Sequence, residues 1–563
     1  MNQTASFSEN DLPPVANVLP INFNAAGPAS VSSPKAAPAA SAPEAAVPPT
    51  TNDKVAIANR DHFIILPSGD MSFSEAATAI FSKIAATRKL FFRAGRIVRP
   101  VQDAEGRNLL EAVQPTAFRS ILENFGALFA WRAGESGPVL KPVRCSEDTA
   151  RALMSCDAAR ELLPYVNVIS PCPILAKGPD GEIKLLGPGW HDHQGGTFVA
   201  GNVMPAQVEY KEAVAALSEL ISDFDFATPG DRARALASLL TPALKFGGWL
   251  NRLTPLDVGE ADQSQSGKTY RQEMVAAIYG MLPYCTGKKD GGVGSLDESL
   301  QSAILAGHTF ILIDNVRGNL NSEFLERVLT NPKVVPCRVP HKGEVVVDAS
   351  NLLFQLTSNL AQMTRDAANR SSIVRNRKRP IDYKFKSFNG LDAKSHVQAN
   401  QGYYLGCVFA LIEEWCANDN PRSDVRTGNA FAEWASVLDW FTQNVFSAGE
   451  LMAGMKDAAD RVCDPKKSWV RNVGIALKVK GKHGEKLGSA VLAEFSIDNE
   501  TMPPGVRPDA DEMSVARKIG SIFGGMFSDS INVIEVDGIK VTRVLVWNST
   551  DGRNDKRYIF SAA

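Results

Sequence analysis

The chain has 563 residues, of which 44% are hydrophobic and 22% are charged, as in ordinary globular proteins. Its length predicts several domains, because a single hydrophobic core rarely grows beyond about 250–300 residues. The formal net charge of -2 excludes a polycation that binds nucleic acid through a global field, so any such contact must come from local patches.

Eight cysteines are scattered along the sequence, and no two of them form a Cys-x-x-Cys pair. We therefore expect no zinc site, and we expect reduced thiols, as in cytoplasmic proteins. The sequence has no run of about 18 apolar residues, and its N-terminus lacks a basic segment followed by an apolar one. The expected location is the cytoplasm, with no membrane as a partner.

Ala, Pro, Ser and Thr dominate the first 60 residues. With few large apolar side chains, residues 1–60 cannot offset the entropy of ordering, so we expect a disordered tail that is either simply solvated or a tether. From about residue 61 the sequence predicts a mixed α/β domain that extends to residue 205. Its expected elements are a helix at 72–89, a strand and turn at 90–100, a helix at 118–131, and strands at 173–177 and 182–187.

Helices are expected at 211–223 and 229–246, and an apolar run that ends at Val258 follows them. The run leads into a candidate nucleotide-binding loop of eight residues: Asp262, Gln263, Ser264, Gln265, Ser266, Gly267, Lys268 and Thr269. A loop between a strand and a helix turns backbone N–H groups and the positive helix end toward phosphate. We expect Lys268 to reach the β- and γ-phosphates and the Thr269 hydroxyl to bind Mg²⁺. Asp262 stands where such loops carry glycine, and its carboxylate would repel polyphosphate unless it is turned away.

A second apolar run, residues 309–313, leads to Asp314, as expected of a buried parallel strand. Asp314 would hold Mg²⁺ through water. The next residue is Asn315, whose amide can orient a water molecule but cannot accept its proton. The sequence therefore predicts ATP binding, whereas hydrolysis needs a base from Glu298 or from a neighbouring subunit.

Arginines are frequent after a third apolar strand, which covers residues 352–359 and ends on Asn359. One of them, such as Arg370 or Arg375, would reach across a subunit interface to the γ-phosphate. Such residues are worth about 10³–10⁵ in rate. The alternative is a solvated basic face.

Four motifs in this order resemble a known group of ATPases. They are Gly267-Lys268-Thr269, Ile313-Asp314-Asn315, Thr357-Ser358-Asn359 and the segment 366–375. The resemblance is to the P-loop ATPase module of phage, plasmid and integrated-element primase–helicase replication proteins, which is related to AAA+ and superfamily 3 helicases. It covers roughly residues 85–390 and is specific at the ATPase motifs.

The resemblance implies an α/β fold with a P-loop NTPase (AAA+-like) core at 206–390. It implies ATP and Mg²⁺ as cofactors, with Lys268, Asp314 and Asn315 in catalysis and Asn359 sensing the γ-phosphate. In that group the acid is commonly followed by Asn, as Asp314 is here. The resemblance also implies self-association into a ring, expected to be a hexamer, and a primase or another replication protein as a partner.

Residues 391–464 are expected to be helical, with helices at 403–415 and 430–446. Residues 465–563 predict two further helices, then a hairpin around Asp537-Gly538 and a last strand, which together indicate a winged-helix-like domain. Such domains commonly bind DNA, and the alternative is a protein-docking wing with solvated charges. The candidate DNA contacts are Lys478, Lys480 and Lys482 in an expected basic loop at 478–486, and Arg517, Lys518, Arg543, Arg553, Lys556 and Arg557.

The leading interpretation is an ATP-driven ring motor on single-stranded or forked DNA, a replicative helicase of a mobile genetic element. The alternative is a nucleotide-gated assembly or regulatory ATPase with little hydrolysis and no unwinding, for which Asp262 and Asn315 are the reasons. A third interpretation is a structural DNA-binding protein with a relic loop. Primase activity is not predicted, because no spaced acids precede a suitable histidine, and His191-Asp192-His193 is expected to be a polar turn.

Overall fold

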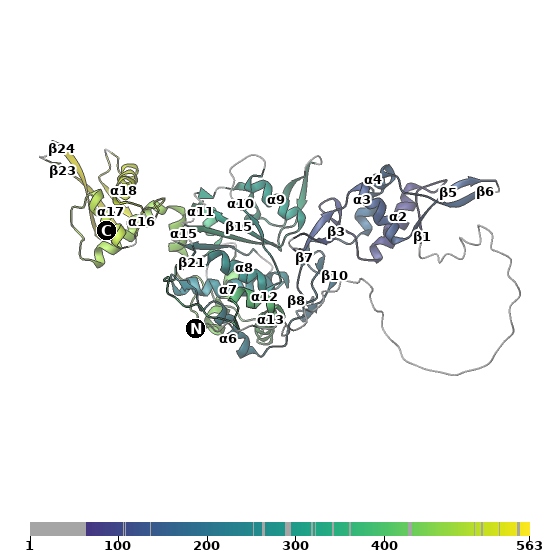
Figure 1. Cartoon of the computed structure of the whole chain (residues 1–563), viewed down its shortest axis with the longest axis horizontal. Helices are drawn as coiled ribbons and strands as arrows, with labels where there is room; N and C mark the ends of the chain where they lie inside the picture. The colour runs from purple at the N-terminus through teal and green to yellow at the C-terminus, as the bar shows by residue number, and fades with distance from the viewer. Residues whose placement is uncertain are drawn as a thin grey trace, which may run out of the picture. The chain divides into compact units, whose positions relative to one another are not determined.

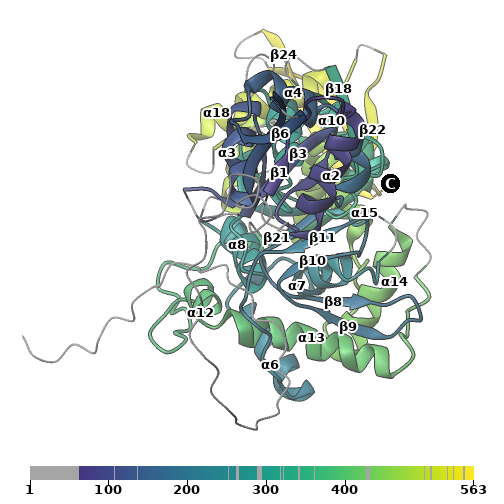
Figure 2. The same cartoon turned by 90° about the vertical axis from the view of Figure 1, so that its right-hand side faces the viewer.

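The computed structural model has a mixed α/β architecture, which Figures 1 and 2 show from two directions. It describes residues 63–562 except 105, 107, 136, 251–252, 262–264, 288–293, 317–318, 321, 340–342, 360–361, 426–430, 500, 508–509, 529, 537 and 549–551. The expected disordered tail, residues 1–60, lies outside the described residues. Among the described helices, none is both long enough and apolar enough to span a bilayer.

Helix α2 (Phe73–Ala86) confirms the first expected helix and begins at a capping box of Ser72 and Glu75. The helix expected at 118–131 is wrong in its second half, because α3 (Pro115–Phe125) ends before Gly126 and strand β5 (Ala127–Gly134) follows. Gly126 interrupts the helix, and the buried side chains of β5 then alternate with a period of two. Strand β5 pairs with β1 (Phe63–Ile65) and β6 (Gly137–Pro142).

Short strands complete the region up to residue 205. β2 (Phe91–Arg93), β3 (Arg96–Gln102) and β4 (Asn108–Ala112) form one sheet, and β8 (Ile174–Lys177) and β9 (Ile183–Leu186) form a hairpin. The strands expected at 90–100, 173–177 and 182–187 are thereby confirmed. The hairpin side chains of Ile174 and Leu186 pack in the same hydrophobic cluster as the helices that follow them in the sequence.

A six-stranded sheet forms the centre of residues 206–464, with the order β12-β21-β13-β19-β15-β14. The parallel strands are β13 (Leu256–Ala261), β14 (Tyr284–Thr286), β15 (Phe310–Val316), β19 (Leu353–Asn359) and β21 (Ser371–Arg377), and β12 (Asp225–Phe226) is antiparallel. After β13 the chain crosses to β14 at one edge, whereas after β19 it crosses to β21 on the other side of β13. The connections that leave these two neighbouring strands therefore run to opposite sides. Open α/β sheets bind ligands at such a switch point, outside the carboxyl ends of the strands.

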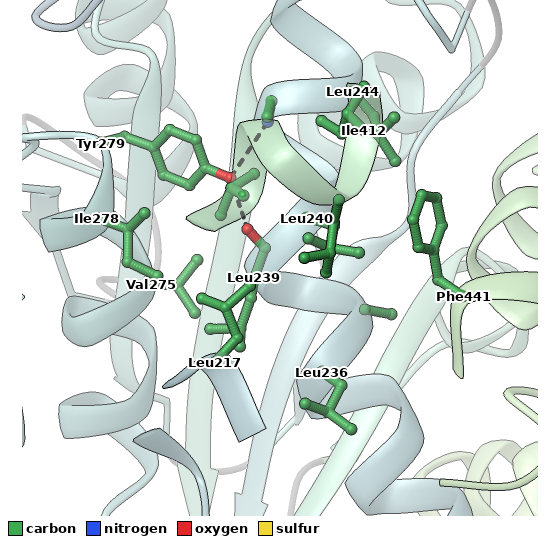
Figure 3. Close-up of a cluster of buried hydrophobic side chains, with 14 of the residues drawn as sticks. Leu217, Leu236, Leu239, Leu240, Leu244, Val275, Ile278, Tyr279, Ile412 and Phe441 are labelled. Atoms are coloured by element: carbon green, nitrogen blue, oxygen red, sulfur yellow. Dashed lines mark hydrogen bonds between the residues drawn. The ribbon is translucent and has the colours of Figure 1, made fainter. Parts of the chain in front are cut away.

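One face of the sheet is covered by α7 (Pro229–Phe246) and α8 (Lys268–Ile278), which pack with α6 (Tyr210–Leu220) and α13 (Gln401–Ala417). Figure 3 shows leucines of α7 lying between apolar side chains of α8 and α13. Pro242 lies inside α7, where it disturbs the helical ladder. The Tyr279 hydroxyl accepts from the Ala243 N–H and donates to the Leu239 carbonyl, bridging the two groups that a regular helix would join directly.

The opposite face packs against α9 (Leu296–Ala306), α10 (Glu323–Thr330), α11 (Arg365–Asn369) and α15 (Met455–Cys463). Helices α12 (Ala393–Ala399), α13 and α14 (Ala432–Trp440) lie in the segment that was expected to be helical, and α14 continues as a short π-helix over Phe441–Val445. The sheet thus lies between two separate hydrophobic clusters, as in a layered α/β fold.

The last part of the chain consists of α16 (Pro465–Val479), α17 (Ser489–Asp498), α18 (Glu512–Met526) and the antiparallel sheet β22-β23-β24. Strands β22 (Val533–Val536), β23 (Ile539–Asn548) and β24 (Arg553–Ala562) confirm the expected hairpin and last strand, although Asp537 of the turn lies outside the described residues. The loop expected at 478–486 begins later than predicted, because Lys478 belongs to the last turn of α16 and Lys480 is its C-cap. Leu487 pairs with Tyr558, which ties the segment before α17 to the sheet.

Candidate nucleotide site

The loop after β13 turns through two residues with positive φ and then starts α8. These are Gln265 (φ 61°) and Gly267 (φ 82°), and Gly267 is the N-cap of the helix. A Cβ on Gly267 would lie 3.1 Å from Cε1 of Phe224, so both the backbone and the space favour glycine. Asp262, Gln263 and Ser264 of the expected loop lie outside the described residues.

Lys268 is a buried lysine in the first turn of α8. Its Nζ donates to Oδ1 of Asn359 over 2.7 Å and to Oγ of Ser266 over 3.4 Å. The fold therefore brings together the ends of β13 and β19 at the N-terminus of α8, as the sequence predicted. An ammonium group held there lies beside the helix end that attracts phosphate.

Thr269 and Asp314 form the second contact at this edge. The Thr269 hydroxyl donates to Oδ1 of Asp314 over 2.9 Å, and the Thr357 hydroxyl donates to the same oxygen. A hydroxyl and a carboxylate are hard oxygen donors of the kind that Mg²⁺ prefers, so the two residues fit the expected metal site. The protein keeps the carboxylate oriented through Thr357 on the neighbouring strand.

Asn315 adopts a left-handed backbone conformation with φ 50°. The pairing of β15 with β19 shifts register between Ile313 and Val316, and the Asn315 N–H donates to Oγ1 of Thr357 over 2.8 Å. Asn tolerates positive φ better than Glu does, which gives a backbone reason for an amide at this position. Because of this bulge, β15 continues past Asp314 rather than ending on it.

Thr357 is a site residue whose individual role the sequence did not predict. It is buried, and its hydroxyl both donates to Asp314 and accepts from the Asn315 backbone. The sequence could have indicated this role, because Thr357 lies two residues before Asn359 in an apolar strand, and alternation places both side chains on the same face.

Buried polar side chains fasten α8 to the sheet behind the site. Arg271 makes a bidentate ion pair with Asp257 of β13, at 2.6 and 3.2 Å, and it also donates to the Ser238 hydroxyl. The amide of Gln272 donates to the backbone carbonyls of Asp257 and Leu356, so it joins α8 to β13 and β19. These contacts fix the position of the helix that carries Lys268 and Thr269. The sequence feature that could have indicated them is the adjacent polar pair Arg271 and Gln272, which follows the loop on the side of the helix that faces the sheet.

Tyr270 connects the same helix to α12. Its hydroxyl donates to Oδ1 of Asp392 over 2.6 Å, and Lys394 pairs with Glu273 at 2.8 Å. Hydrogen bonds from the Ser395 hydroxyl and then from Tyr270 hold the pKa of Asp392 well below its usual value. Burial raises the pKa of Tyr270, so the phenol stays protonated and keeps donating.

The two candidate arginines lie at different ends of β21. The carbonyl of Arg370 accepts from the Leu256 N–H at the start of β13, so Arg370 lies at the amino edge of the sheet, and its guanidinium pairs with Asp366 at 2.9 Å. Arg375 pairs in register with Glu260, near the carboxyl edge, and its N–H donates to Asp231. Arg370 therefore lies at the opposite edge from Lys268 of the same chain.

Glu260 is a buried carboxylate two positions before the loop. A Cβ on Gly259 would face Lys268, so by alternation Glu260 faces the other side of the sheet. There it forms an ion pair with Arg461 of α15. The candidate base Glu298 is engaged elsewhere, because its carboxylate accepts from the Gly294 N–H at the start of α9.

The candidate DNA contacts lie at the end of α16 and in the turn that follows it, on α18 and on the β23-β24 hairpin. Arg543 donates to Oδ1 of Asn532 and to the Ser528 carbonyl, and Arg557 pairs with Asp555 at 3.2 Å. Lys482 lies 5.7 Å from the ring centre of Phe495. The other expected contacts on these elements are Lys478, Lys480, Arg517, Lys518, Arg553 and Lys556.

Comparison with known proteins found no matching family model and no matching curated protein. Among solved structures, the A-form apo structure of the NrS-1 C terminal region matches at 11% identity and a TM-score of 0.37, over 85% of this chain and 98% of that one. An active helicase, Cch of SCCmec type IV, matches at 10% identity and a TM-score of 0.29, over 84% and 97%. An inhibitor-bound JCV helicase matches at 12% identity and a TM-score of 0.21, over 43% of this chain and 66% of that one. Likenesses this low carry no weight for function.

Proposed function

We propose that this chain is an ATP-dependent motor that acts on DNA, with a P-loop NTPase core of the AAA+ kind and a winged-helix-like C-terminal domain. The observation that carries the proposal is the meeting of Lys268 with Asn359, and of Thr269 with Asp314, at the switch point of a parallel sheet. Single motifs of this kind are weak evidence, whereas their convergence on one edge is specific.

In this proposal the loop N–H groups and Lys268 hold the phosphates of ATP, and Thr269 and Asp314 hold Mg²⁺. The metal supplies charge neutralisation at the transferred phosphate. Asn359, which bonds Lys268 here, exchanges that contact for the γ-phosphate. Thr357 keeps Asp314 oriented, and Asn315 orients the attacking water.

The remaining parts of the proposal concern assembly. The chain forms a hexameric ring in which Arg370 or Arg375 of one copy completes the site of the next, since Arg370 lies at the edge of the sheet remote from its own Lys268. The motor acts in the cytoplasm on single-stranded or forked DNA, as the replicative helicase of a mobile element, with a primase or another replication protein as a partner.

The test is ATP hydrolysis by the full chain with and without DNA. Lys268→Ala is expected to abolish DNA-stimulated turnover while the thermal unfolding transition stays in place. Lys394→Ala is a matched control, because Lys394 also contacts α8 but bonds Glu273 rather than Asn359. Undiminished turnover in Lys268→Ala would refute the assignment.

The second candidate is a nucleotide-gated assembly protein with little hydrolysis. Asn315 at the position after the acid, together with the engagement of Glu298 at its own helix end, favours it. Strand displacement on a forked duplex separates the two, because a gate would bind ATP and oligomerise without unwinding.

A further inference from the structure

The β23-β24 hairpin carries an apolar face that changes from buried to exposed along its length. Alternation places Val541, Arg543, Leu545 and Trp547 on one face of β23. Val541 is fully buried, whereas Leu545 is 61% exposed and Trp547 is 65% exposed. In Figure 1 these two strands extend beyond α17 and α18 of the same part of the chain.

The facing strand supplies polar and cationic neighbours for this exposed end. In the register of the hairpin, Leu545 lies opposite Lys556 and Trp547 lies opposite Asn554. Directly opposed side chains in an antiparallel pair lie close enough to form one surface. A large aromatic side chain, an aliphatic one and an ammonium group therefore share one exposed face.

The charge of the hairpin differs in sign from that of the whole chain. Residues 539–562 contain five Lys or Arg and two Asp, a net charge of +3, whereas the chain carries -2. An apolar protein partner would not require this excess of cations. An anionic partner with flat apolar groups would match both the exposed apolar side chains and the excess of cations. A nucleic acid strand is such a partner, because it has phosphates and base faces.

We propose that this face, made of Leu545, Trp547 and Lys556, binds single-stranded nucleic acid. An unpaired base stacks on the Trp547 indole and the adjoining phosphate lies next to Lys556. Bases within a duplex are already stacked on one another, so an exposed indole gains most from an unpaired base. The proposal rests on the proposed function in taking DNA as the partner, and it adds the strand form and the contacting element.

The test is equilibrium binding of a fluorescein-labelled twenty-nucleotide oligo(dT) to the full chain without nucleotide, followed by anisotropy. Trp547→Ala is expected to weaken binding about 5- to 150-fold, the range that one aromatic–base stack supplies. Trp547→Phe keeps a stacking face and is expected to stay within about 3-fold of the parent chain. Phe385→Ala is the matched control, because Phe385 is equally exposed, at 66%, and lies outside the hairpin; its affinity is expected to stay unchanged.

Two further ligands complete the design. Blunt duplex DNA is expected to bind Trp547→Ala and the parent chain alike, and an equal loss on duplex would overturn the claim for unpaired bases. Oligo(U) tests whether the sugar matters. If Trp547→Ala loses the same factor of affinity for oligo(U) as for oligo(dT), the face binds unpaired bases of either nucleic acid. An unchanged oligo(dT) affinity in Trp547→Ala would overturn the proposal and leave the face to a protein partner.

Failure of the proposed function is separable from failure of this inference. Lys268→Ala is expected to bind oligo(dT) normally in the absence of nucleotide, because Lys268 is buried at the other site. Loss of ATP turnover in that variant tests the motor alone, and the Trp547 series tests the hairpin alone. A thermal unfolding transition within about 2 °C of the parent chain is expected for Trp547→Ala, since surface substitutions usually change stability little.

Discussion

Removing one hydroxyl at Thr357 tests how Asp314, the proposed Mg²⁺ ligand, is held. In Thr357→Val, Asp314 loses a donor and the Asn315 N–H loses its acceptor, at a side chain that is 1% exposed. An unsatisfied buried polar group costs about 1–3 kcal/mol, so a loss of stability in this range is expected. The more specific effect concerns Mg²⁺, because partners that orient a metal ligand are typically worth about 10- to 100-fold in metal affinity or activity.

The assay is ATP turnover titrated with Mg²⁺. Thr357→Val is expected to need about 10- to 100-fold more Mg²⁺ for half-maximal turnover, and Thr357→Ser, which keeps the hydroxyl, is expected to restore the parent midpoint. Ser358→Ala is the matched control on the same strand. The Ser358 hydroxyl is equally buried and donates to the Val316 carbonyl over 2.7 Å, so its loss should lower stability without moving the Mg²⁺ midpoint. An unmoved midpoint in Thr357→Val, or an equal shift in Ser358→Ala, would refute the orienting role.

Three further predictions follow from single contacts. Asn315 has φ 50°, a conformation that Gly adopts easily and Glu does not. Asn315→Gly should therefore keep the unfolding temperature of the parent chain, whereas Asn315→Glu should lower the free energy of unfolding by about 1 kcal/mol. Equal unfolding temperatures of the two variants would contradict the strain argument. Arg461→Ala leaves Glu260 buried without its ion-pair partner and should lower the free energy of unfolding by roughly 3–5 kcal/mol. Arg365→Ala breaks an exposed pair with Asp460 and should lower it by at most about 1 kcal/mol. Similar shifts of the unfolding temperature in the two variants would contradict the role of the Arg461–Glu260 pair. An equal mixture of Lys268→Ala and Arg370→Ala chains should regain about a quarter of parent turnover if Arg370 acts across the interface of the proposed ring. At about a quarter of such interfaces, an intact Lys268 from one copy meets an intact Arg370 from the next. No recovery, tested likewise with Arg375→Ala, would exclude that arginine.

Much of the central fold could be predicted because β13, β15 and β19 contain runs of apolar residues and glycines mark several of the turns between elements. The period of the apolar residues identified β13, β15 and β19, and parallel pairing then required their ends to meet, as Lys268 and Asn359 do. Helix α7 was predicted at its observed limits, since Thr228 and Pro229 mark its start and glycines follow Phe246.

The elements that were missed lack a local signal. The arginine-rich segment was expected to supply an arginine to a neighbouring subunit, with a solvated basic face as the alternative, and no strand was predicted there. Strand β21 runs through it because Ile373 and Val374 pack on the two faces of the sheet. The hairpin of β17 (Val335–Val339) and β18 (Gly343–Val347) and the strand β5 were also not predicted. Their stability depends on pairing with distant segments, which a local pattern does not contain.

In the candidate site, the sequence indicated the motif residues but not the side chains that hold them. Lys268, Thr269 and Asp314 belong to recognisable motifs, whereas the partners that hold them come from remote strands and helices. Thr357, Gln272 and Arg461 act through contacts across 42 to 201 positions of sequence. Such pairs become visible only when the sheet order is known.

The central claim is that Mg²⁺ and ATP bind together at the N-terminus of α8. Equilibrium binding of labelled ATP to the full chain, with and without Mg²⁺, tests it most directly. The account predicts binding at micromolar concentrations that requires Mg²⁺, a weakening of about 10- to 100-fold in Lys268→Ala, and no change in Lys394→Ala. Absence of binding to the parent chain, or equal affinity in Lys268→Ala, would contradict the account and leave the loop as a relic.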